Sequence, residues 1–168
     1  MQLVQTVFDA SFWINAHEVA VLDFLSDYFI LYSPNIVINE ILHPLSTTGM
    51  LSPAGKALQE WLNKGKITIQ NPVEAVNWFQ PGENAAIALA KEQGCRLLID
   101  DQNPYHRAKS HGLSVTGSAD FILFLYIQKR LSYEETLSRL RYLSAGKHLT
   151  RQVLGLLGEL ARVRGDKP

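Results

Sequence analysis

The alternation of short apolar runs with helical segments is the feature that most constrains the fold of this chain. Each run is four to six residues long, the length of a buried strand, and helical periodicity or a helix-capping residue follows it. The five strands predicted in this way are residues 3–8, 28–33, 66–70, 96–99 and 113–116. Strands that alternate with helices predict an α/β fold, in which a parallel sheet carries helices on both faces.

Capping residues and apolar periodicity place the helices between these strands. Ser11 is predicted to cap a helix that begins at Phe12, and Thr150 to cap the last helix. A capping box of Ser132 and Glu135 opens the helix before that one. The other predicted helices begin at Pro34-Asn35 or cover residues 55–64, 83–93, 104–111 and 118–129, and residues 46–55 are predicted to be a loop. The three tryptophans, Trp13, Trp61 and Trp78, are dispersed and are expected to pack in the core or in loops.

Length and composition indicate one cytoplasmic domain. A chain of 168 residues is long enough to bury one full core, so residues 1–168 are expected to form a single domain. Cys95 is the one cysteine, which excludes an internal disulfide and favours a reducing compartment. The N-terminus lacks the pattern of a signal peptide, and the longest apolar run, residues 121–127, is too short to span a bilayer. We therefore expect no membrane partner.

Charge is distributed unevenly along the chain although its formal sum is +0. Residues 1–128 hold seven Lys or Arg and twelve Asp or Glu, a balance of −5, whereas residues 129–168 hold nine and four, a balance of +5. We call residues 130–168 the basic arm and expect it to be helical. The arm either meets a polyanion or an acidic partner, or is a solvated helix surface.

Five carboxylates occupy positions that a parallel sheet would bring together. Asp9 follows the first predicted strand, and Asp100 and Asp101 follow the fourth. Glu40 lies on the helix after the second strand, and Glu83 lies in the first turn of the helix that leads into the fourth. The carboxyl ends of parallel strands share one edge of the sheet, which is where such sheets bind ligands. We expect these side chains to gather at that edge.

Gathered carboxylates repel one another, at a cost of roughly 4 kcal/mol for a pair about 4 Å apart at an effective dielectric constant of about 20. Either some of them take up protons or a cation joins them. A ligand set of oxygens alone suits a hard ion such as Mg²⁺ or Mn²⁺. Such an ion polarises phosphate oxygens and generates hydroxide from water, so hydrolysis of a phosphodiester is the reaction this set serves best.

Each acid also has a structural interpretation. Glu83 can favour the dipole of its helix, and Glu40 can be a solvated helix residue. Asp9 can be a turn or cap residue, and one member of the Asp100–Asp101 pair can cap the helix predicted at Pro104. Other catalytic signatures are missing from the sequence, which has no phosphate-binding glycine loop, no G-x-S-x-G elbow and no histidine pair at metal-binding spacing.

Four segments in order resemble the PIN-domain family of metal-dependent nucleases, and the resemblance covers nearly the whole chain. They are VFDAS at residues 7–11, NIVINEIL at 35–42, GENAAIALA at 82–90, and LLIDD at 97–101 followed by RAKSHGLSVTGS at 107–118. The third and fourth resemble the G-E-x-x-A-I-x-L-A and D-D motifs of one PIN-like branch, which is related to the toxins of VapC type.

The resemblance implies a three-layer α/β/α fold around a five-stranded parallel sheet, and one or two Mg²⁺ or Mn²⁺ ions. Carried over by position, the catalytic metal ligands would be Asp9, Glu40, Glu83 and Asp100, with Asp101 supporting or substituting. Ser11 would orient Asp9 or meet a phosphate, and Asn15 would contact RNA. The register leaves open whether Asp120 corresponds to a further acid that several branches carry.

The activity implied is endonucleolytic cleavage of single-stranded RNA by a metal-activated water. RNA would be the partner, together with an antitoxin protein if the chain is a toxin, and a homodimer is a further expectation. Arg107 and Lys109, beside His106, are candidates for contact with phosphate.

Two other classes of protein remain to be weighed. A phosphoryl-transfer or receiver domain would place D-x-D after the first strand, where this chain has Asp9-Ala10-Ser11. A catalytically silent interaction protein could keep the fold without activity, but the acids of the motifs are all present here, which favours an enzyme.

Overall fold

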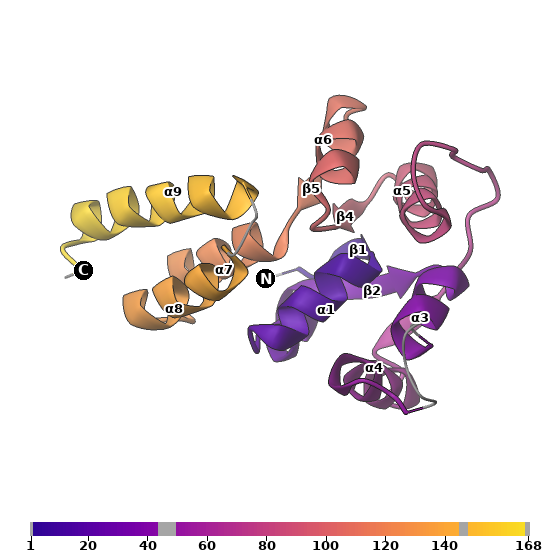
Figure 1. Cartoon of the computed structure of the whole chain (residues 1–168), viewed down its shortest axis with the longest axis horizontal. Helices are drawn as coiled ribbons and strands as arrows, with labels where there is room; N and C mark the ends of the chain where they lie inside the picture. Colours follow the sequence, from indigo (N-terminus) through magenta and orange to yellow (C-terminus); the bar gives the residue numbers. More distant parts are fainter. Residues whose placement is uncertain (1, 44–49, 145–147, 167–168) are drawn as a thin grey trace. The chain divides into compact units, whose positions relative to one another are not determined.

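Two compact units make up the chain in the computed structural model, which describes residues 2–43, 50–144 and 148–166. Unit 1 is Met1–Thr116 and unit 2 is Gly117–Pro168 (Figure 1). The basic arm begins inside unit 2, at residue 130. That all 168 residues form a single domain stays a prediction.

Unit 1 contains a sheet of five parallel strands in the order β3-β2-β1-β4-β5. The strands are β1 (Val4–Phe8), β2 (Phe29–Ser33), β3 (Ile67–Ile69), β4 (Arg96–Leu98) and β5 (Val115–Thr116). Each begins and ends within two residues of its predicted bounds. The predicted α/β fold with a five-stranded parallel sheet is confirmed.

The order of the strands decides which helices cover which face. The chain moves from β1 to β2 to β3 in one direction across the sheet and then returns to β4 and β5 on the other side of β1. Right-handed crossovers therefore put the helices between β1 and β3 on one face and those between β3 and β5 on the other. The first set is α1 (Ala10–Glu18), the 3₁₀ helix η1 (Leu22–Phe24), α2 (Leu25–Tyr28), α3 (Asn35–Leu42) and α4 (Pro53–Asn63), and the second is α5 (Pro81–Gln93) and α6 (Gln102–Ser110). The result is the three-layer α/β/α arrangement that the resemblance implied.

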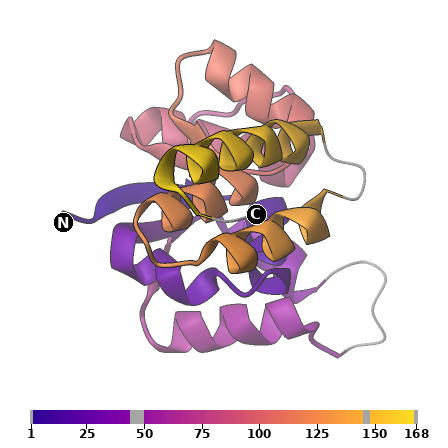
Figure 2. The same ribbon diagram turned by 90° about the vertical axis from the view of Figure 1, so that its left-hand side faces the viewer.

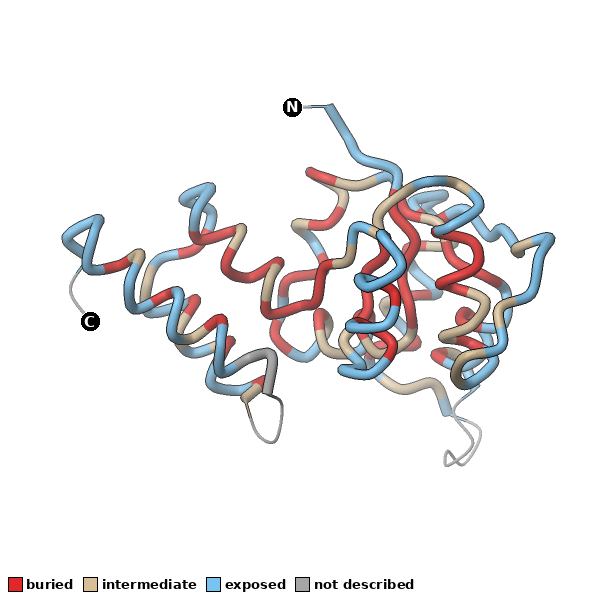
Figure 3. Tube along the Cα trace, turned by 90° about the horizontal axis from the view of Figure 1, so that it is seen from above, coloured by how far each residue is buried: buried red, intermediate tan, exposed pale blue. Residues whose placement is uncertain are grey.

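Burial on both faces of the central strands shows where the core lies. Val7 and Phe8 are successive residues of β1 and so point to opposite faces, yet both are fully buried. Figure 3 colours the chain by burial, with the buried segments in red. Trp13 of α1 packs edge-on against Trp61 of α4, with 5.5 Å between ring centroids, and its indole N–H donates to the Ala54 carbonyl oxygen at 3.0 Å. These two tryptophans belong to the core, as the sequence predicted.

Several predicted helix starts are wrong, because capping geometry rather than composition sets them. Asp9, not Ser11, caps α1, since its Oδ2 accepts the Ser11 backbone N–H at 3.0 Å. The loop predicted over residues 46–55 ends earlier, because Ser52 caps α4 and Pro53 is its first residue. Residues 44–49 lie outside the described part of the chain.

The starts of two later helices also differ from prediction. Asp101 is the N-cap residue of α6, which begins at Gln102 rather than at Pro104. The last helix, α9 (His148–Arg164), already includes residue 150, so Thr150 is inside the helix and not its cap. A threonine before an apolar run resembles an N-cap residue, but α9 begins two residues before Thr150, at His148.

Unit 2 is helical and consists, where described, of α7 (Ser118–Ile127), α8 (Tyr133–Leu143) and α9, with α8 and α9 side by side (Figure 2). The predicted capping box opens α8: the Ser132 N–H donates to Glu135 Oε2 at 2.8 Å, and the Glu135 N–H donates to Ser132 Oγ at 3.2 Å. Within the described residues, no helix combines the length and apolar character needed to cross a membrane.

Candidate carboxylate site

Four acidic side chains line one cavity of unit 1, with a volume of about 470 Å³. They are Asp9, Glu40, Glu83 and Asp101. The rest of the lining is Ala10, Ser11, His43, Gln80 and Pro81. The structure thus brings together four of the five acids that the sequence singled out, and Asp100 is not among the lining residues. We call this space the carboxylate cavity.

Strand register explains why Asp9 and Asp101 meet. Phe8 of β1 pairs with Leu98 of β4, so the two strands end at the same edge of the sheet. The Asp9 backbone N–H extends this pairing by donating to the Leu98 carbonyl oxygen at 2.9 Å. Parallel pairing of the two central strands therefore gathers acids that are about ninety residues apart in sequence.

Asp9 is the most buried acid of the cavity, with 2% of its surface exposed. Its Oδ2 accepts two hydrogen bonds from Ser11, from the backbone N–H at 3.0 Å and from the hydroxyl at 2.8 Å. The loss of water on burial raises the pKa of Asp9, and the Asp101 carboxylate raises it further, while the bonds from Ser11 and the Ala10 backbone act in the opposite direction. Ser11 therefore orients Asp9, one of the two roles expected for it.

The two adjacent aspartates have different surroundings. Asp100 accepts a hydrogen bond from the side-chain amide of Asn15, and its backbone N–H donates to Ser11 Oγ at 3.1 Å. Asp101 lines the carboxylate cavity. The sequence favoured Asp100 over Asp101 as the metal ligand, and that assignment stays a prediction. Asn15 lies on α1, and its side-chain amide donates to the Asp100 carboxylate. Its expected contact with RNA stays a prediction.

Glu40 reaches the cavity by lying against the first turn of α5. The Gly82 backbone N–H donates a hydrogen bond to its carboxylate. A Cβ atom on Gly82 would lie 2.2 Å and 2.5 Å from the two carboxylate oxygens of Glu40, closer than any real contact. A side chain at position 82 would therefore displace the carboxylate. Although Glu40 as a whole residue is exposed, loss of water at its carboxylate raises its pKa, and the charges of Asp9 and Glu83 add to this.

Gly82 was missed as a functional residue although it lies in a recognised motif. The sequence carries one signal of its role: a glycine in the first turn of a helix, where alanine would stabilise the helix. What the sequence does not contain is the partner, since Glu40 is forty-two residues away on α3.

Glu83 both stabilises the start of α5 and lines the carboxylate cavity. Its Oε2 accepts the Gln80 backbone N–H at 3.0 Å, which stabilises the start of α5. Partial burial raises the pKa of Glu83, the bond from Gln80 lowers it, and the charges of Asp9 and Asp101 together with a hydrogen bond to the Asp101 side chain raise it again. The neighbouring carboxylates of the cavity thus disfavour the ionised form of Glu83.

The donor chemistry of the cavity fits a hard divalent cation, because its acidic lining offers carboxylate oxygens and no thiolate. Such an ion would offset the burial and the repulsion that raise the pKa values of Asp9, Glu40 and Glu83. As the side chains stand, no three Asp, Glu, His or Cys residues in the described part of the chain are arranged to hold a metal ion. Binding an ion would therefore require the carboxylates to move inward.

The remaining candidates lie elsewhere. Arg107 and Lys109 are exposed on α6, beside aromatic rings. Asp120 belongs to unit 2, where its Oδ2 accepts the Gly117 N–H at 2.9 Å and so caps α7. On the basic arm, Arg139 donates to the Glu135 carbonyl oxygen at 3.2 Å, Arg141 and Arg151 are exposed, and Lys147 lies outside the described residues.

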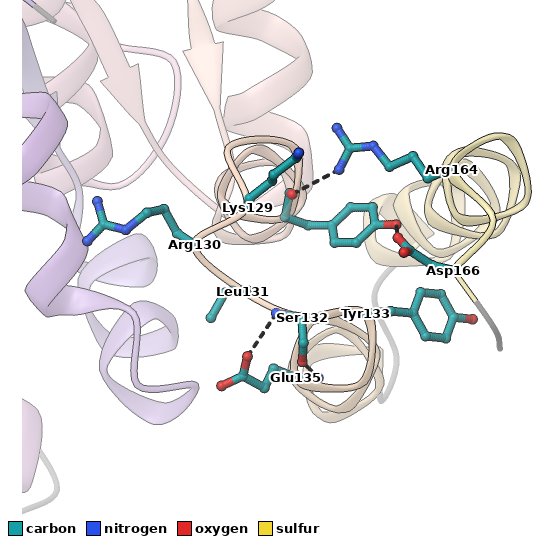
Figure 4. Close-up of a pocket in the computed structure, with 9 residues that line it drawn as sticks. Lys129, Arg130, Leu131, Ser132, Tyr133, Glu135, Arg164 and Asp166 are labelled. Atoms are coloured by element: carbon teal, nitrogen blue, oxygen red, sulfur yellow. Dashed lines mark hydrogen bonds between the residues drawn. The ribbon is translucent and has the colours of Figure 1, made fainter.

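Unit 2 has a cavity of its own, of about 710 Å³, between the end of α7, the start of α8 and the end of α9 (Figure 4). Its lining is Tyr126, Lys129, Arg130, Leu131, Ser132, Tyr133, Glu135, Arg164 and Asp166. The Tyr126 hydroxyl donates to Asp166, and Arg164 donates to the carbonyl oxygens of Tyr126 and Ile127. Acidic and basic groups share this lining, unlike the carboxylate cavity. We call it the mixed-charge cavity.

The five-stranded parallel sheet and the carboxylates at its edge define an α/β protein of the PIN-like class. Residues 5–159 match the model of the family DUF3368, described as a PIN domain, so the chain belongs to this PIN-domain family. PIN domains are in general metal-dependent nucleases. The predicted family is confirmed, and the VapC-related branch stays a prediction.

Among solved structures, the chain is similar to a PilT N-terminus domain protein from the hyperthermophilic archaeon Sulfolobus solfataricus. The two share 13% sequence identity over 68% of this chain and 87% of the other, with a TM-score of 0.42. No curated protein matches the chain.

Proposed function

We propose that this chain is an Mg²⁺- or Mn²⁺-dependent endoribonuclease that cleaves single-stranded RNA at the carboxylate cavity. One observation carries the proposal: acids from four separate segments line a single cavity, and burial together with neighbouring carboxylates raises the pKa values of Asp9, Glu40 and Glu83. Such perturbed groups in a cavity are typical of a functional site. Membership of a PIN-domain family supports the same reaction class.

The residues of the cavity would have different roles in this reaction. Asp9, Glu40 and Glu83, with one member of the Asp100–Asp101 pair, would hold the cation. A bound Mg²⁺ or Mn²⁺ supplies polarisation of a phosphate oxygen and activation of water. The Ser11 hydroxyl and the Gly82 N–H fix the orientation of Asp9 and Glu40. A raised pKa brings Glu40 and Glu83 closer to the pH at which a carboxylate can exchange a proton with water.

A partner and a biological role extend this proposal. The basic arm offers cations to an RNA or to an acidic antitoxin, as in toxins of VapC type, and two copies of the chain would form a homodimer. The second candidate function is a catalytically silent interaction protein. It is favoured by one observation, that the described acids are not arranged as a ready-made metal centre.

Cleavage of a mixed-sequence single-stranded RNA, with Mn²⁺, with Mg²⁺ and with EDTA, tests the proposal. We expect cleavage by the wild type with metal and loss of cleavage in EDTA. Glu83→Gln removes a charge from the cavity and should reduce the rate by at least about a hundredfold, since even partners of metal ligands are worth about 10–100-fold. Glu60→Gln, on the exposed surface of α4, is the matched control and should keep full activity.

Cleavage that persists in EDTA would contradict the metal mechanism. An intact fold that binds RNA but cleaves none of it with either metal would favour the silent interaction protein.

A further inference from the structure

An exposed cluster of aromatic and cationic side chains lies in unit 1 outside the carboxylate cavity. Trp78, in the loop before α5, has its ring centroid 4.3 Å from that of His111, which caps the end of α6. The guanidinium carbon of Arg107 lies 5.1 Å from the centre of the Trp78 ring. We call these three residues the Trp78 cluster. The sequence suggested only that Trp78 packs in the core or in a loop.

Trp78 differs from the other two tryptophans in its exposure. Trp13 and Trp61 are core residues with 0% and 6% of their surfaces exposed, whereas Trp78 is only half-buried. A tryptophan that remains accessible to solvent beside an arginine and a histidine is typical of a binding surface rather than of a core.

Hydrogen bonds to Asn84 fix the backbone of the loop that carries Trp78. The backbone N–H groups of Trp78 and Phe79 donate to Asn84 Oδ1 at 2.9 Å and 2.8 Å. The Asn84 side-chain amide donates in return to the Phe79 carbonyl oxygen at 2.7 Å. Because Asn84 follows Glu83 on α5, the helix that presents an acid to the carboxylate cavity also fixes the Trp78 loop.

The tautomer of His111 follows from its partner. The Nδ1 atom lies 2.9 Å from the Arg107 carbonyl oxygen, and because a carbonyl can only accept, Nδ1 must carry the hydrogen. The Nε2 atom is then the ring nitrogen that can accept a hydrogen bond from a ligand.

The segment that carries the cluster is basic within an acidic unit. Unit 1 as a whole has eleven acidic residues and seven Lys or Arg, yet residues 102–111 contain two cations, two histidines and no acid. In the described part of the chain, Arg107 and Lys109 meet no carboxylate; their charges lie over the rings of Trp78 and Tyr105, at 5.1 Å and 5.7 Å. Cations without acidic partners attract an anionic ligand.

Both chain segments of the cluster lead into the carboxylate cavity. Gln80 lines the cavity and comes two residues after Trp78. Asp101 lines the cavity and is the N-cap residue of α6, so Arg107 lies six residues further on, about 9 Å along the helix axis. A polymer bound at the cluster is thereby within reach of the acids.

We propose that the Trp78 cluster binds single-stranded nucleic acid beside the carboxylate cavity, with a base against the indole and a phosphate at Arg107. The inference rests on the proposed nuclease function and names the surface through which the substrate is held. Aromatic stacking tolerates every base, so this surface gives affinity without sequence preference. Double-stranded nucleic acid, whose bases are already stacked, should bind more weakly.

Tryptophan fluorescence tests the proposal directly, because Trp78 is the accessible tryptophan. A short oligouridylate is titrated into the full-length protein in EDTA, which separates binding from metal-dependent cleavage. We expect the wild-type emission to be quenched and Trp78→Phe to lose most of that quenching. Anisotropy of a labelled oligouridylate then measures affinity without relying on tryptophan.

In the anisotropy assay, Trp78→Leu should weaken binding by about tenfold, the effect expected from loss of one stacked base. Arg107→Gln should weaken it at low salt and reduce the slope of log affinity against log salt by about 1. Lys56→Gln, an exposed cation of α4, is the matched control and should change neither quantity. Thermal melts check that each variant is folded, and Arg107→Gln, at an exposed position, gives the decisive result if Trp78→Leu unfolds.

The proposal is overturned if the wild type does not bind the oligouridylate, or if Arg107→Gln and folded Trp78→Leu bind it as tightly as the wild type. The cluster would then be a contact that fixes the loop. That result leaves the nuclease function untouched, because cleavage by Glu83→Gln tests the cavity separately.

Discussion

The carboxylate cavity of unit 1 and the mixed-charge cavity of unit 2 differ in how their charges are balanced. The larger, mixed-charge cavity holds Lys129, Arg130 and Arg164 together with Glu135 and Asp166. The smaller, carboxylate cavity holds four acids and no Lys or Arg. Volume alone would favour the mixed-charge cavity, whereas the sign and balance of charge make the carboxylate cavity the one suited to a cation.

The same difference appears in the titration of each cavity's groups. In the mixed-charge cavity, burial and the bond to Asp166 raise the pKa of Tyr126, while Arg164 acts against them. In the carboxylate cavity, burial raises the pKa values of Asp9, Glu40 and Glu83, and their neighbours' charges add to the effect. One cavity has its compensating charge within the chain, and the other would receive it from a bound ion.

Glycine substitutions in the two units should give the largest contrast. Gly82→Ala places a Cβ where the Glu40 carboxylate lies, and that carboxylate, at the end of a flexible exposed side chain, can swing away; the lost hydrogen bond from the position-82 N–H should offset the gain in helix propensity, so stability should stay within about 1 kcal/mol of the wild type. It should also weaken the response of the melting temperature to Mn²⁺. Gly158→Ala is the matched control in α9, where nothing lies within 4 Å of the new Cβ, and it should stabilise by about 0.5–1 kcal/mol. Equal effects of the two changes on the melting temperature and on its response to Mn²⁺ would contradict the close packing of Gly82 and Glu40.

The Asp100–Asp101 pair gives the next largest effect. Removing a repelling charge from the cavity should stabilise the metal-free protein by about 1 kcal/mol or less, because solvent screens part of the repulsion. Because Asp101 lines the cavity, Asp101→Asn should stabilise the metal-free protein in this way and should lose most of the stabilisation by Mn²⁺. Asp100→Asn, beside Asn15, is the comparison. Melts of both variants with and without Mn²⁺ decide the ligand, and loss of the Mn²⁺ response in Asp100→Asn alone would restore the sequence-based assignment.

The pH dependence of stability should have opposite signs in the two units. Asp9, Glu40 and Glu83 have raised pKa values, so their stabilising contribution is present below their unfolded values of about 4 and is lost as pH rises through the folded values. In EDTA the melting temperature should therefore fall as pH rises above about 4.5, and Mn²⁺ should reduce that fall. Glu135 of unit 2 has a pKa lowered by its bonds to Ser132, so its contribution is lost as pH falls. Glu40→Gln should reduce the fall of the melting temperature at rising pH, and Glu135→Gln should reduce its fall at falling pH. Thermal melts of both variants across pH check this, and a variant that keeps the wild-type pH dependence would contradict it.

The basic arm should give the smallest effect, on salt dependence. If its cations meet phosphates, replacing Arg141 and Arg151 by Gln should reduce the salt slope of RNA binding by up to about 2. Both are exposed, so the fold should be unchanged. An unchanged slope would assign the arm to a protein partner or to solvation.

The sequence by itself determined the elements of this protein and the acids at its sheet edge. Strand length and apolar runs predicted all five strands, and the spacing of Ser132 and Glu135 predicted the capping box, because these signals lie within a few neighbouring residues. Parallel alternation was enough to predict that Asp9 and the aspartate pair meet, since every strand of such a sheet ends at the same edge.

The tertiary structure alone decided how these residues are used. Which aspartate of the pair lines the cavity depends on how the chain turns from β4 into α6, and sequence spacing does not specify that turn. Gly82 is explained only by the Glu40 carboxylate that α3 brings against it. The position of Trp78 is explained only by the hydrogen bond that its backbone N–H donates to Asn84 and by the contact of its ring with His111 at the end of α6. Periodicity records which face of an element is apolar, but the identity of the side chain opposite is fixed by packing between segments that are distant in sequence.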